Sequence, residues 1–211
     1  MNEAAYYSAD SFRQRAENQK GNPLHLAWRD HGDHRLNPGS VEQAMELKLK
    51  DAAVLIPVID DLDGAKVILT QRTTKLRKHS GQIAFPGGGI DPEDTSAEVA
   101  ALREAEEEIG LDRRFVETVG RLPDYFSGTG FRITPVLSVV QRGFEIIPNP
   151  DEVDRVFEVP LAFLMNPDNH RRDSRVWQGS VRHFYVMPYG EYNIWGITAG
   201  ILRTLYERLY A

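Results

Sequence analysis

Cysteine is absent from this chain of 211 residues, and its absence excludes several kinds of chemistry. A protein without thiols forms no disulfide, carries no thiolate nucleophile and builds no zinc site from cysteines. The stretch over residues 1–20 has no basic segment followed by an apolar one, so it predicts no secretory signal. These features are compatible with a reducing compartment, and we expect a soluble cytoplasmic protein.

Long hydrophobic runs are also missing. The two longest, AAVLIPVI at 52–59 and IWGITAGIL at 194–202, are far shorter than the ~20 residues of a membrane-spanning helix. The formal net charge of -6 argues against a broad nucleic-acid surface, because such surfaces are basic. The negative net charge does not exclude a small phosphate-bearing ligand, since a bound divalent cation reverses the local sign of the charge. We therefore expect neither a membrane nor a nucleic acid as partner.

The residues that are present indicate a globular α+β protein. Hydrophobic residues make up 41% of the chain and charged residues 27%, which suits a packed core and not a disordered chain. We divide the sequence into an N-terminal arm over 1–45, which opens with an amphipathic helix over 1–20, and one domain over 46–211. The mixed order of strands and helices predicts helices against a mixed sheet.

Hydrophobic periodicity and turn residues predict the elements of the domain. Strands are expected at 52–59, 66–72, 115–122, 131–140 and 153–159. The first two form a hairpin, and a second hairpin over 175–188 turns at Gln178 and Gly179. A short helix is predicted at 161–165 and a terminal helix at 195–209. The terminal helix fits a core position better than an interface because its apolar residues recur at helical spacing: Ile197, Ile201, Leu202, Leu205 and Leu209.

The most informative segment is an acidic helix predicted over 96–109. Asp94, Thr95 and Ser96 are good N-terminal caps, and Gly110 is a good terminator. At about 100° per residue, three carboxylates fall on one side and converge on one patch, those of Glu104, Glu107 and Glu108. Three apolar residues fall on the opposite side, Val99, Leu102 and Ile109.

Like charges at this spacing repel one another, and a hard divalent cation removes that penalty. Carboxylates suit Mg²⁺ or Mn²⁺, which bind diphosphates and lower the pKa of a bound water. Arg103 is placed to orient Glu107 by an ion pair, whereas Glu106 falls near the apolar face and is not counted as a ligand. Acidic helix faces are commonly just solvated. Here the preceding glycines, Gly87–Gly89, and the lack of any lysine after Lys78 favour metal binding.

The stretch from Gly89 to Leu111 resembles the Nudix box, whose pattern is Gly, five residues, Glu, seven residues and Arg-Glu-apolar-x-Glu-Glu-x-Gly-apolar. The segment REAEEEIGL at 103–111 fills the end of the pattern. The first Glu falls on Thr95, one residue after Asp94. In the family that glutamate supports the helix more than it binds metal, so we expect activity to survive the change. The resemblance implies the Nudix fold, a mixed sheet sandwiched between helices, and metal-dependent hydrolysis of a diphosphate.

A second motif lies directly before the box. The segment ILTQRTTKLRKHSGQIAFPGG at 68–88 resembles the signature of coenzyme A pyrophosphatases, Leu-Leu-Thr-x-Arg-Ser/Ala, three residues, Arg, three residues, Gly, three residues and Phe-Pro-Gly-Gly. The matching positions are Leu69, Thr70, Arg72, Arg77, Gly81, Phe85, Pro86, Gly87 and Gly88. Ile68 and Thr73 are mild departures. DEVDRVFEVPLAFL and IWGITAGIL also look like this subfamily, so the resemblance covers roughly residues 50–209.

The resemblance implies a set of site residues. The metal ligands and catalytic residues would be Glu104, Glu107 and Glu108, with Arg103 in the catalytic set. The substrate-binding residues would be Arg72, Arg77, Gly81, Phe85 and Gly88, the arginines by pairing with phosphate. Phe85 and Gly87–Gly89 also have a purely structural interpretation, as packing and turn residues. Lys75, Lys78 and His79 are interpreted mainly as surface residues.

The implied reaction is attack of water on one phosphorus of coenzyme A, which gives 4′-phosphopantetheine and adenosine 3′,5′-bisphosphate, with Mg²⁺ or Mn²⁺ as cofactor. The general base stays open among Glu104, Glu107 and a distal acid such as Glu152. The alternatives are a Nudix hydrolase of ADP-ribose, a dinucleotide or a nucleoside triphosphate, and a Nudix-fold binding module, which the three intact acids disfavour. An EF-hand is disfavoured because its loop ligands are missing. A homodimer stays open, as does the role of the arm, which either covers the site or mediates association.

Overall fold

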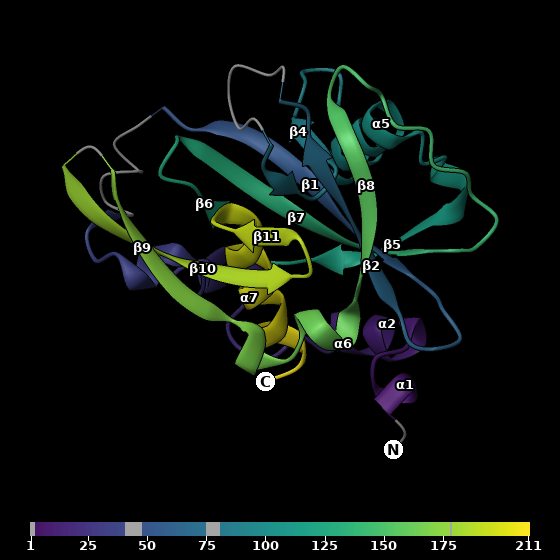
Figure 1. Cartoon of the computed structure of the whole chain (residues 1–211), viewed down its shortest axis with the longest axis horizontal. Helices are drawn as coiled ribbons and strands as arrows, with labels where there is room; N and C mark the ends of the chain where they lie inside the picture. Colours follow the sequence, from purple (N-terminus) through teal and green to yellow (C-terminus); the bar gives the residue numbers. More distant parts are fainter. Residues whose placement is uncertain (1–2, 41–47, 75–80, 178) are drawn as a thin grey trace.

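The computed structural model describes residues 3–40, 48–74, 81–177 and 179–211 (Figure 1). Its main sheet has the strand order β3-β2-β1-β7-β5, and β4, β6 and β8 add to it by pairing with β1, β7 and β2. The strands are β1 (Lys50–Ile59), β2 (Lys66–Arg72), β3 (Ile83–Ala84), β4 (Gly87–Gly89), β5 (Val116–Arg121), β6 (Tyr125–Phe126), β7 (Phe131–Val140) and β8 (Val153–Pro160). β1 and β7 run parallel along their whole lengths and the other pairs are antiparallel, so the predicted mixed sheet is confirmed.

A second, antiparallel sheet of order β11-β10-β9 stands beside the first. Its strands are β9 (Arg171–Trp177), β10 (Ser180–Tyr189) and β11 (Tyr192–Trp195). The hairpin predicted over 175–188 is confirmed as β9 and β10, although Gln178, half of the expected turn, lies outside the described residues. β11 takes the start of the segment that we assigned to the terminal helix, which begins only at Ile197.

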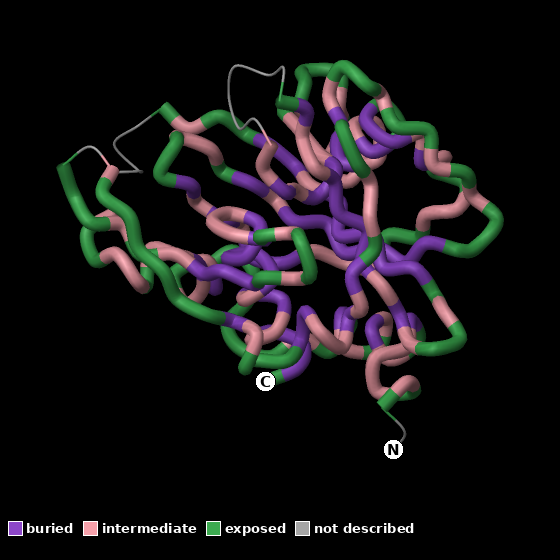
Figure 2. Tube along the Cα trace, in the orientation of Figure 1, coloured by how far each residue is buried: buried purple, intermediate pink, exposed green. Residues whose placement is uncertain are grey.

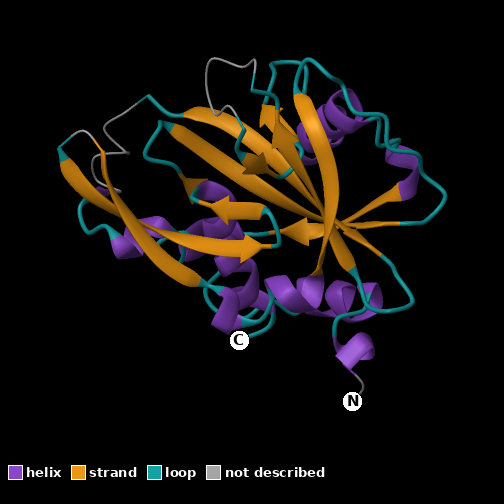
Figure 3. Cartoon of the chain, viewed as in Figure 1, coloured by secondary structure: helices purple, strands orange, loops and turns teal. Residues whose placement is uncertain are grey.

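Helices cover both faces of the main sheet, which makes the three-layer α+β fold that the sequence predicts (Figure 3). Alternate residues of β1 point to opposite faces. Ala53 and Leu55 join the core beneath α5 (Ala97–Ile109), whereas Ala52 and Ile56 join the core shared with α2 (Ala9–Glu17) and α7 (Ile197–Leu209). The remaining helical segments are α1 (Glu3–Tyr6), α3 (Leu24–Ala27), η1 (Asp33–Leu36), η2 (Arg113–Phe115), α6 (Leu161–Leu164) and η3 (Pro167–Asn169).

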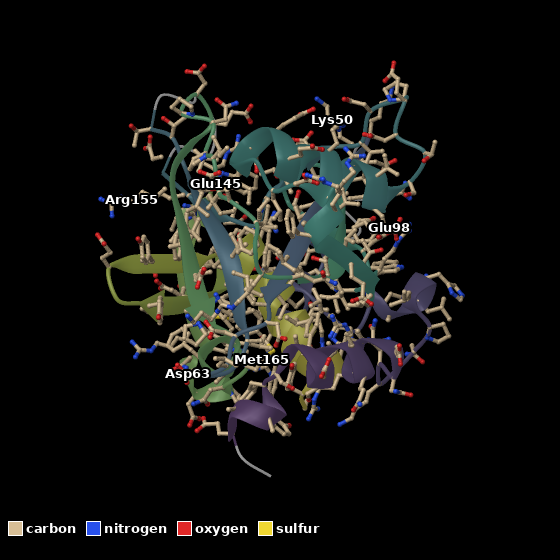
Figure 4. All side chains as sticks on the ribbon, turned by 90° about the vertical axis from the view of Figure 1, so that its right-hand side faces the viewer. Lys50, Asp63, Glu98, Glu145, Arg155 and Met165 are labelled. Atoms are coloured by element: carbon tan, nitrogen blue, oxygen red, sulfur yellow. The ribbon has the colours of Figure 1, made fainter. Side chains whose placement is uncertain are left out.

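The acidic helix begins and ends where the sequence predicts. The Ser96 hydroxyl caps α5 by accepting a hydrogen bond from the Val99 amide, and Gly110 ends it with a left-handed φ of 68°. Glu98 in the first turn, labelled in Figure 4, is held by the guanidinium of Arg121 from β5. Because both ends of α5 are fixed, the positions of its acidic residues are fixed relative to the sheet.

The predicted burial of α5 is wrong in detail. Val99 and Leu102 are only half-buried, and the side against the sheet is made of small residues, Ala97, Ala100, Ala101 and Ala105, with Ile109. Small side chains let a helix approach a sheet closely. Compared with the prediction, α5 is rotated about its own axis, so that Glu108 lies on the buried side. Glu106 is exposed and pairs with Arg113.

The N-terminal arm lies against the domain (Figure 2). Ala9, Phe12 and Ala16 of α2 are buried in the same core as α7. Arg15 donates a hydrogen bond of 2.8 Å to the carbonyl oxygen of Leu209. The terminal helix is buried along its apolar side, as predicted. In the described parts of the chain, no helix is long and apolar enough to cross a membrane.

Gly87 is where β4 approaches β1 most closely, and its replacement is expected to destabilise the protein. Its φ is 154°, and a β-carbon there would lie 2.4 Å from the Ala53 carbonyl oxygen and 2.6 Å from the Val54 Cα. We expect Gly87→Ala to lower the free energy of unfolding by about 2 kcal/mol or more, measured by urea denaturation. Gly89→Ala is the control, because a β-carbon at Gly89 meets nothing within 4 Å. Equal effects of the two substitutions would contradict this account.

Candidate active site

The candidate active site is built where β4 lies against α5. Gly88 has no side chain, and a β-carbon there would lie 2.4 Å from the Cδ of Glu104. The glycine therefore makes the space in which the Glu104 carboxylate lies. That carboxyl is half-buried, and its burial raises its pKa, which the neighbouring Arg103 opposes.

Glu108 is the most constrained acid of the site, with only 2% of its side chain exposed. Its Oε1 accepts a hydrogen bond of 3.0 Å from Nη1 of Arg72, and its Oε2 accepts one of 3.1 Å from the Gly87 amide. Burial raises the pKa of Glu108 to about 7, although the Gly87 hydrogen bond and the Arg72 charge both lower it. Two partners thus compensate the buried charge only in part.

Arg103 joins the other two acids into one network. Its Nη1 donates to Oε1 of Glu104 at 3.0 Å and to Oε2 of Glu107 at 3.2 Å, which confirms the predicted ion pair with Glu107. Its Nε and Nη2 donate to the carboxylate of Asp94 at 3.2 and 2.9 Å, and Nη2 also donates to the Gly89 carbonyl oxygen. Asp94 is therefore the acid that holds the arginine in place, beside the position where the box pattern has its first glutamate.

The three glutamates are each paired with an arginine: Glu104 and Glu107 with Arg103, and Glu108 with Arg72. Within the described residues, no three acidic or histidine side chains are close enough together to hold a metal ion, so the predicted cation site stays a prediction. The donor set still suits a hard divalent cation, since it consists of carboxylates on successive helical turns beside an open glycine strand.

Glu152 is brought to this group from a distant part of the chain. The loop before β8 is tied to α5 by a hydrogen bond of 2.9 Å from the Asn149 amide to the Glu108 carbonyl oxygen. The charge of Glu152 raises the pKa of both Glu104 and Glu108. The distal acid that we considered as a general base is therefore within electrostatic reach of the acidic helix.

A cavity of about 720 Å³ opens beside these residues. Its lining includes Arg72, Gly87 and Gly88, which lie against the acids, and Gly89, whose carbonyl oxygen accepts a hydrogen bond from Arg103. The opposite walls come from η1 of the arm, from the hairpin β9–β10 and from the start of α7. Aromatic side chains form much of the lining: Tyr125 and Phe126 of β6, Phe131 of β7, Trp177 of β9, Phe184 of β10 and Trp195 of β11. A mainly apolar cavity next to convergent charged groups is the usual form of a small-molecule site.

The predicted substrate-binding residues are only partly brought together. Arg72, Phe85 and Gly88 line the cavity, and Phe85 is at the same time 3% exposed and part of the core. Gly81 is a turn residue with φ of 68° that does not line the cavity. Arg77 lies outside the described residues, as do Lys75, Lys78 and His79.

Sequence reasoning missed the residues on the far walls of the cavity, among them Asp33, Arg175, Trp177, Arg182 and Trp195. One signal was present. The segment from 171 to 182 carries four arginines and a tryptophan in a chain with more acidic than basic residues. Interleaved basic and aromatic residues indicate an anionic, ring-bearing ligand.

Residues 49–178 match the family model described as the NUDIX domain. The chain is 42% identical over 159 residues to a protein of Escherichia coli (strain K12) named Uncharacterized Nudix hydrolase NudL, which covers 75% of this chain and 82% of the relative. A protein of the same name from Klebsiella pneumoniae (strain 342) is 42% identical over 167 residues, with the same coverage. A solved structure of a C. elegans Ap4A hydrolase aligns with 54% of this chain and 81% of its own, at 19% identity and a TM-score of 0.45, too low to support an argument.

Asp33 belongs to the cavity walls outside the matched range. It is the single carboxylate among the described lining residues, and its Oδ1 is buried with no hydrogen-bond partner there. Burial raises the pKa of Asp33 to about 7, against hydrogen bonding to the Tyr125 side chain and the Tyr185 backbone. Gly200 of α7 leaves room for the pair, since a β-carbon there would lie 2.6 Å from the Tyr125 hydroxyl and 3.0 Å from Oδ1 of Asp33.

Asp33 is expected to make the stability of the protein fall with rising pH. Its pKa of about 7 in the fold exceeds the ordinary aspartate value, so the fold favours the neutral acid. This contribution is complete below about pH 4 and is lost as the pH rises through about 7. Between pH 5 and 8 the free energy of unfolding, measured by urea denaturation, should fall less for Asp33→Asn than for the wild type. The difference between the two decreases should be on the order of a few kcal/mol. The exposed Asp10→Asn should follow the wild type; coincident curves for wild type and Asp33→Asn would contradict the prediction.

Proposed function

This chain belongs to the NUDIX domain family, and on that premise we propose that it hydrolyses the diphosphate bond of coenzyme A or of its thioesters. The chain is a Nudix pyrophosphohydrolase, and the family binds small nucleotide substrates. The proposed products are 4′-phosphopantetheine and adenosine 3′,5′-bisphosphate. The observation that carries the choice of substrate is the coenzyme A signature over 68–88, four of whose matching residues, Arg72, Phe85, Gly87 and Gly88, line the cavity.

The site residues suit this reaction. Nudix hydrolases generally use divalent metal ions, and we propose that Glu104 and Glu108 would hold Mg²⁺ or Mn²⁺ here, with Glu107 bound directly or through water. When bound, the ion would neutralise the diphosphate and lower the pKa of a bound water. Arg103 and Asp94 keep Glu104 and Glu107 beside the glycine strand, where their carboxylates would be available to hold the ion.

The chemical step transfers a phosphoryl group to water. The water oxygen forms a bond to one phosphorus, the bond from that phosphorus to the bridging oxygen breaks, and the leaving phosphate keeps the electron pair. A carboxylate must take the proton of the water. Glu104, Glu107 and Glu152 are the candidates, and the electrostatic coupling of Glu152 to Glu104 supports keeping the distal acid among them.

We further propose that the N-terminal arm completes the substrate cavity. Asn37 exchanges two hydrogen bonds of 2.8 Å with the backbone of His183 on β10, one as donor and one as acceptor. Asp33, His34, Asn37 and Ser40 all line the cavity. Of the two roles that the sequence left open for the arm, these contacts support covering the site.

The proposed function predicts a metal-dependent cleavage with one preferred substrate. The purified protein is incubated with coenzyme A, ADP-ribose or a dinucleoside polyphosphate, each with Mg²⁺, Mn²⁺ or EDTA, and the products are identified by mass spectrometry. We expect 4′-phosphopantetheine from coenzyme A with a cation, faster than any product of the other substrates, and none with EDTA. Cleavage of another diphosphate with coenzyme A left intact would retain the Nudix chemistry and overturn the substrate. No cleavage of any compound would favour a binding module.

Glu108→Gln is expected to remove activity while the fold remains. The amide keeps the shape of the side chain but loses the charge that would hold a cation, so we expect kcat to fall roughly 100-fold or more. Glu106→Gln on the same helix is the matched control, because Glu106 is exposed and pairs with Arg113. Circular dichroism and the melting temperature report whether each variant folds. A folded Glu108→Gln protein with a near-normal rate would remove the metal assignment.

A further inference from the structure

Two arginines face each other across the hairpin β9–β10. Arg175 and Arg182 are direct cross-strand partners in this antiparallel pair, so their side chains point to the same face. Both line the cavity, as do Trp177 and Phe184 on the same face. Like charges directly opposite each other destabilise a strand pair, and an anion bound between them would remove that penalty.

Aromatic rings lie beside both arginines. The Cζ of Arg175 lies 4.5 Å from the centroid of the Trp195 ring and 6.0 Å from that of Phe184. The Cζ of Arg182 lies 5.6 Å from the Trp177 centroid. A guanidinium that stacks on a ring by its flat face still directs its N–H groups outward along its edge, where they match the oxygens of a phosphate.

Protein carboxylates do not supply the missing charge to Arg175. In the described part of the chain, Arg175 makes no ion pair. Asp173 shares its face, but the Asp173 carboxylate accepts a hydrogen bond from the Ser174 amide. Among the described residues that line the cavity, the arginines are Arg72, Arg175 and Arg182, and the single carboxylate is that of Asp33. Arg72 is already ion-paired with Glu108, so Arg175 is the arginine of the hairpin that offers its charge to a ligand.

The hairpin lies at the end of the cavity away from the catalytic edge. In Figure 1, β9 and β10 extend to the left of the molecule, whereas β4 and α5 lie at the upper right. The residues between them, from β1, β6 and β7, line the same cavity. A ligand that has its diphosphate at Gly87–Gly89 and carries a second, separate anionic group would place that group at the two arginines.

We propose that Arg175 and Arg182 form a subsite for a phosphomonoester, with Trp177, Phe184 and Trp195 as the apolar wall for the attached nucleoside. The inference rests on the proposed function and assigns one end of its substrate: the 3′-phosphate and adenosine of coenzyme A lie against the hairpin. Coenzyme A carries its phosphomonoester on the adenosine, so the pantetheine end, which bears no phosphate beyond the diphosphate, extends elsewhere. The 3′-phosphate is a dianion near neutral pH and matches two guanidinium groups.

Comparison of coenzyme A with dephospho-coenzyme A, which lacks only the 3′-phosphate, tests the subsite. We expect the wild type to have a kcat/KM for coenzyme A roughly tenfold or more above that for dephospho-coenzyme A. In the Arg175→Ala/Arg182→Ala variant this ratio should fall to about one, because the 3′-phosphate then meets no guanidinium group. Arg172→Ala is the matched control, since Arg172 is an exposed arginine of the same strand on the opposite face. A preference that survives the double substitution would overturn the subsite.

A binding measurement separates failure of the subsite from failure of the proposed function. Isothermal titration in EDTA compares adenosine 3′,5′-bisphosphate with adenosine 5′-monophosphate on the wild type, the double variant and Arg172→Ala. Tighter binding of the bisphosphate that is lost only in the double variant would support the subsite, even if coenzyme A is not cleaved. Equal binding of both nucleotides by the wild type would overturn it, even if coenzyme A proves to be the substrate. Melting temperatures confirm that the variants are folded.

Discussion

The carboxylate of Glu108 lies almost completely buried between the sheet and α5, and a buried charge is stable only when its partners are fixed in place. Here the partners come from two strands: the Arg72 guanidinium from β2 and the Gly87 amide from β4. Their compensation is incomplete, because burial still raises the pKa of Glu108 to about 7. The positions of β2, β4 and α5 relative to one another therefore depend on their contacts with the Glu108 carboxylate. The positive charge around this carboxylate does not fully offset the effect of its burial on the pKa.

The partners of Glu108 reach it because α5 and β4 lie very close to the sheet. Alanines on the inner side of α5 bring the helix down onto the sheet, and Gly87 and Gly88 let β4 fit between β1 and the acids. On the solvent side, Asp94 fixes Arg103, which in turn draws Glu104 and Glu107 to the same edge. The small residues of α5 and β4 thus allow the short contacts that fix the positions of the charged residues.

The cavity is built differently from the acidic site, because its walls come from segments that are far apart in the sequence. The matched range, 49–178, contains the edge with the acids and also β9, whereas η1 of the arm, β10, β11 and α7 lie outside it. The far walls carry the aromatic rings and the paired arginines. The match to the family model therefore covers the acids and only part of the walls around the cavity.

Sequence alone determined the elements and the motif. The limits of α5 from Ser96 to Gly110 follow from local capping, and the mixed sheet follows from the mixed order of strands and helices, so both were predicted correctly. The short strands β3, β4, β6 and β11 were not predicted, because so few residues carry no periodicity. Only the tertiary structure decided which side of α5 is buried, where Asp94 acts, and that Asp33 and the hairpin enclose the cavity. The reason is physical: caps and periodicity act between neighbours in the chain, whereas burial, ion pairing and cavity walls depend on contacts between residues far apart in it.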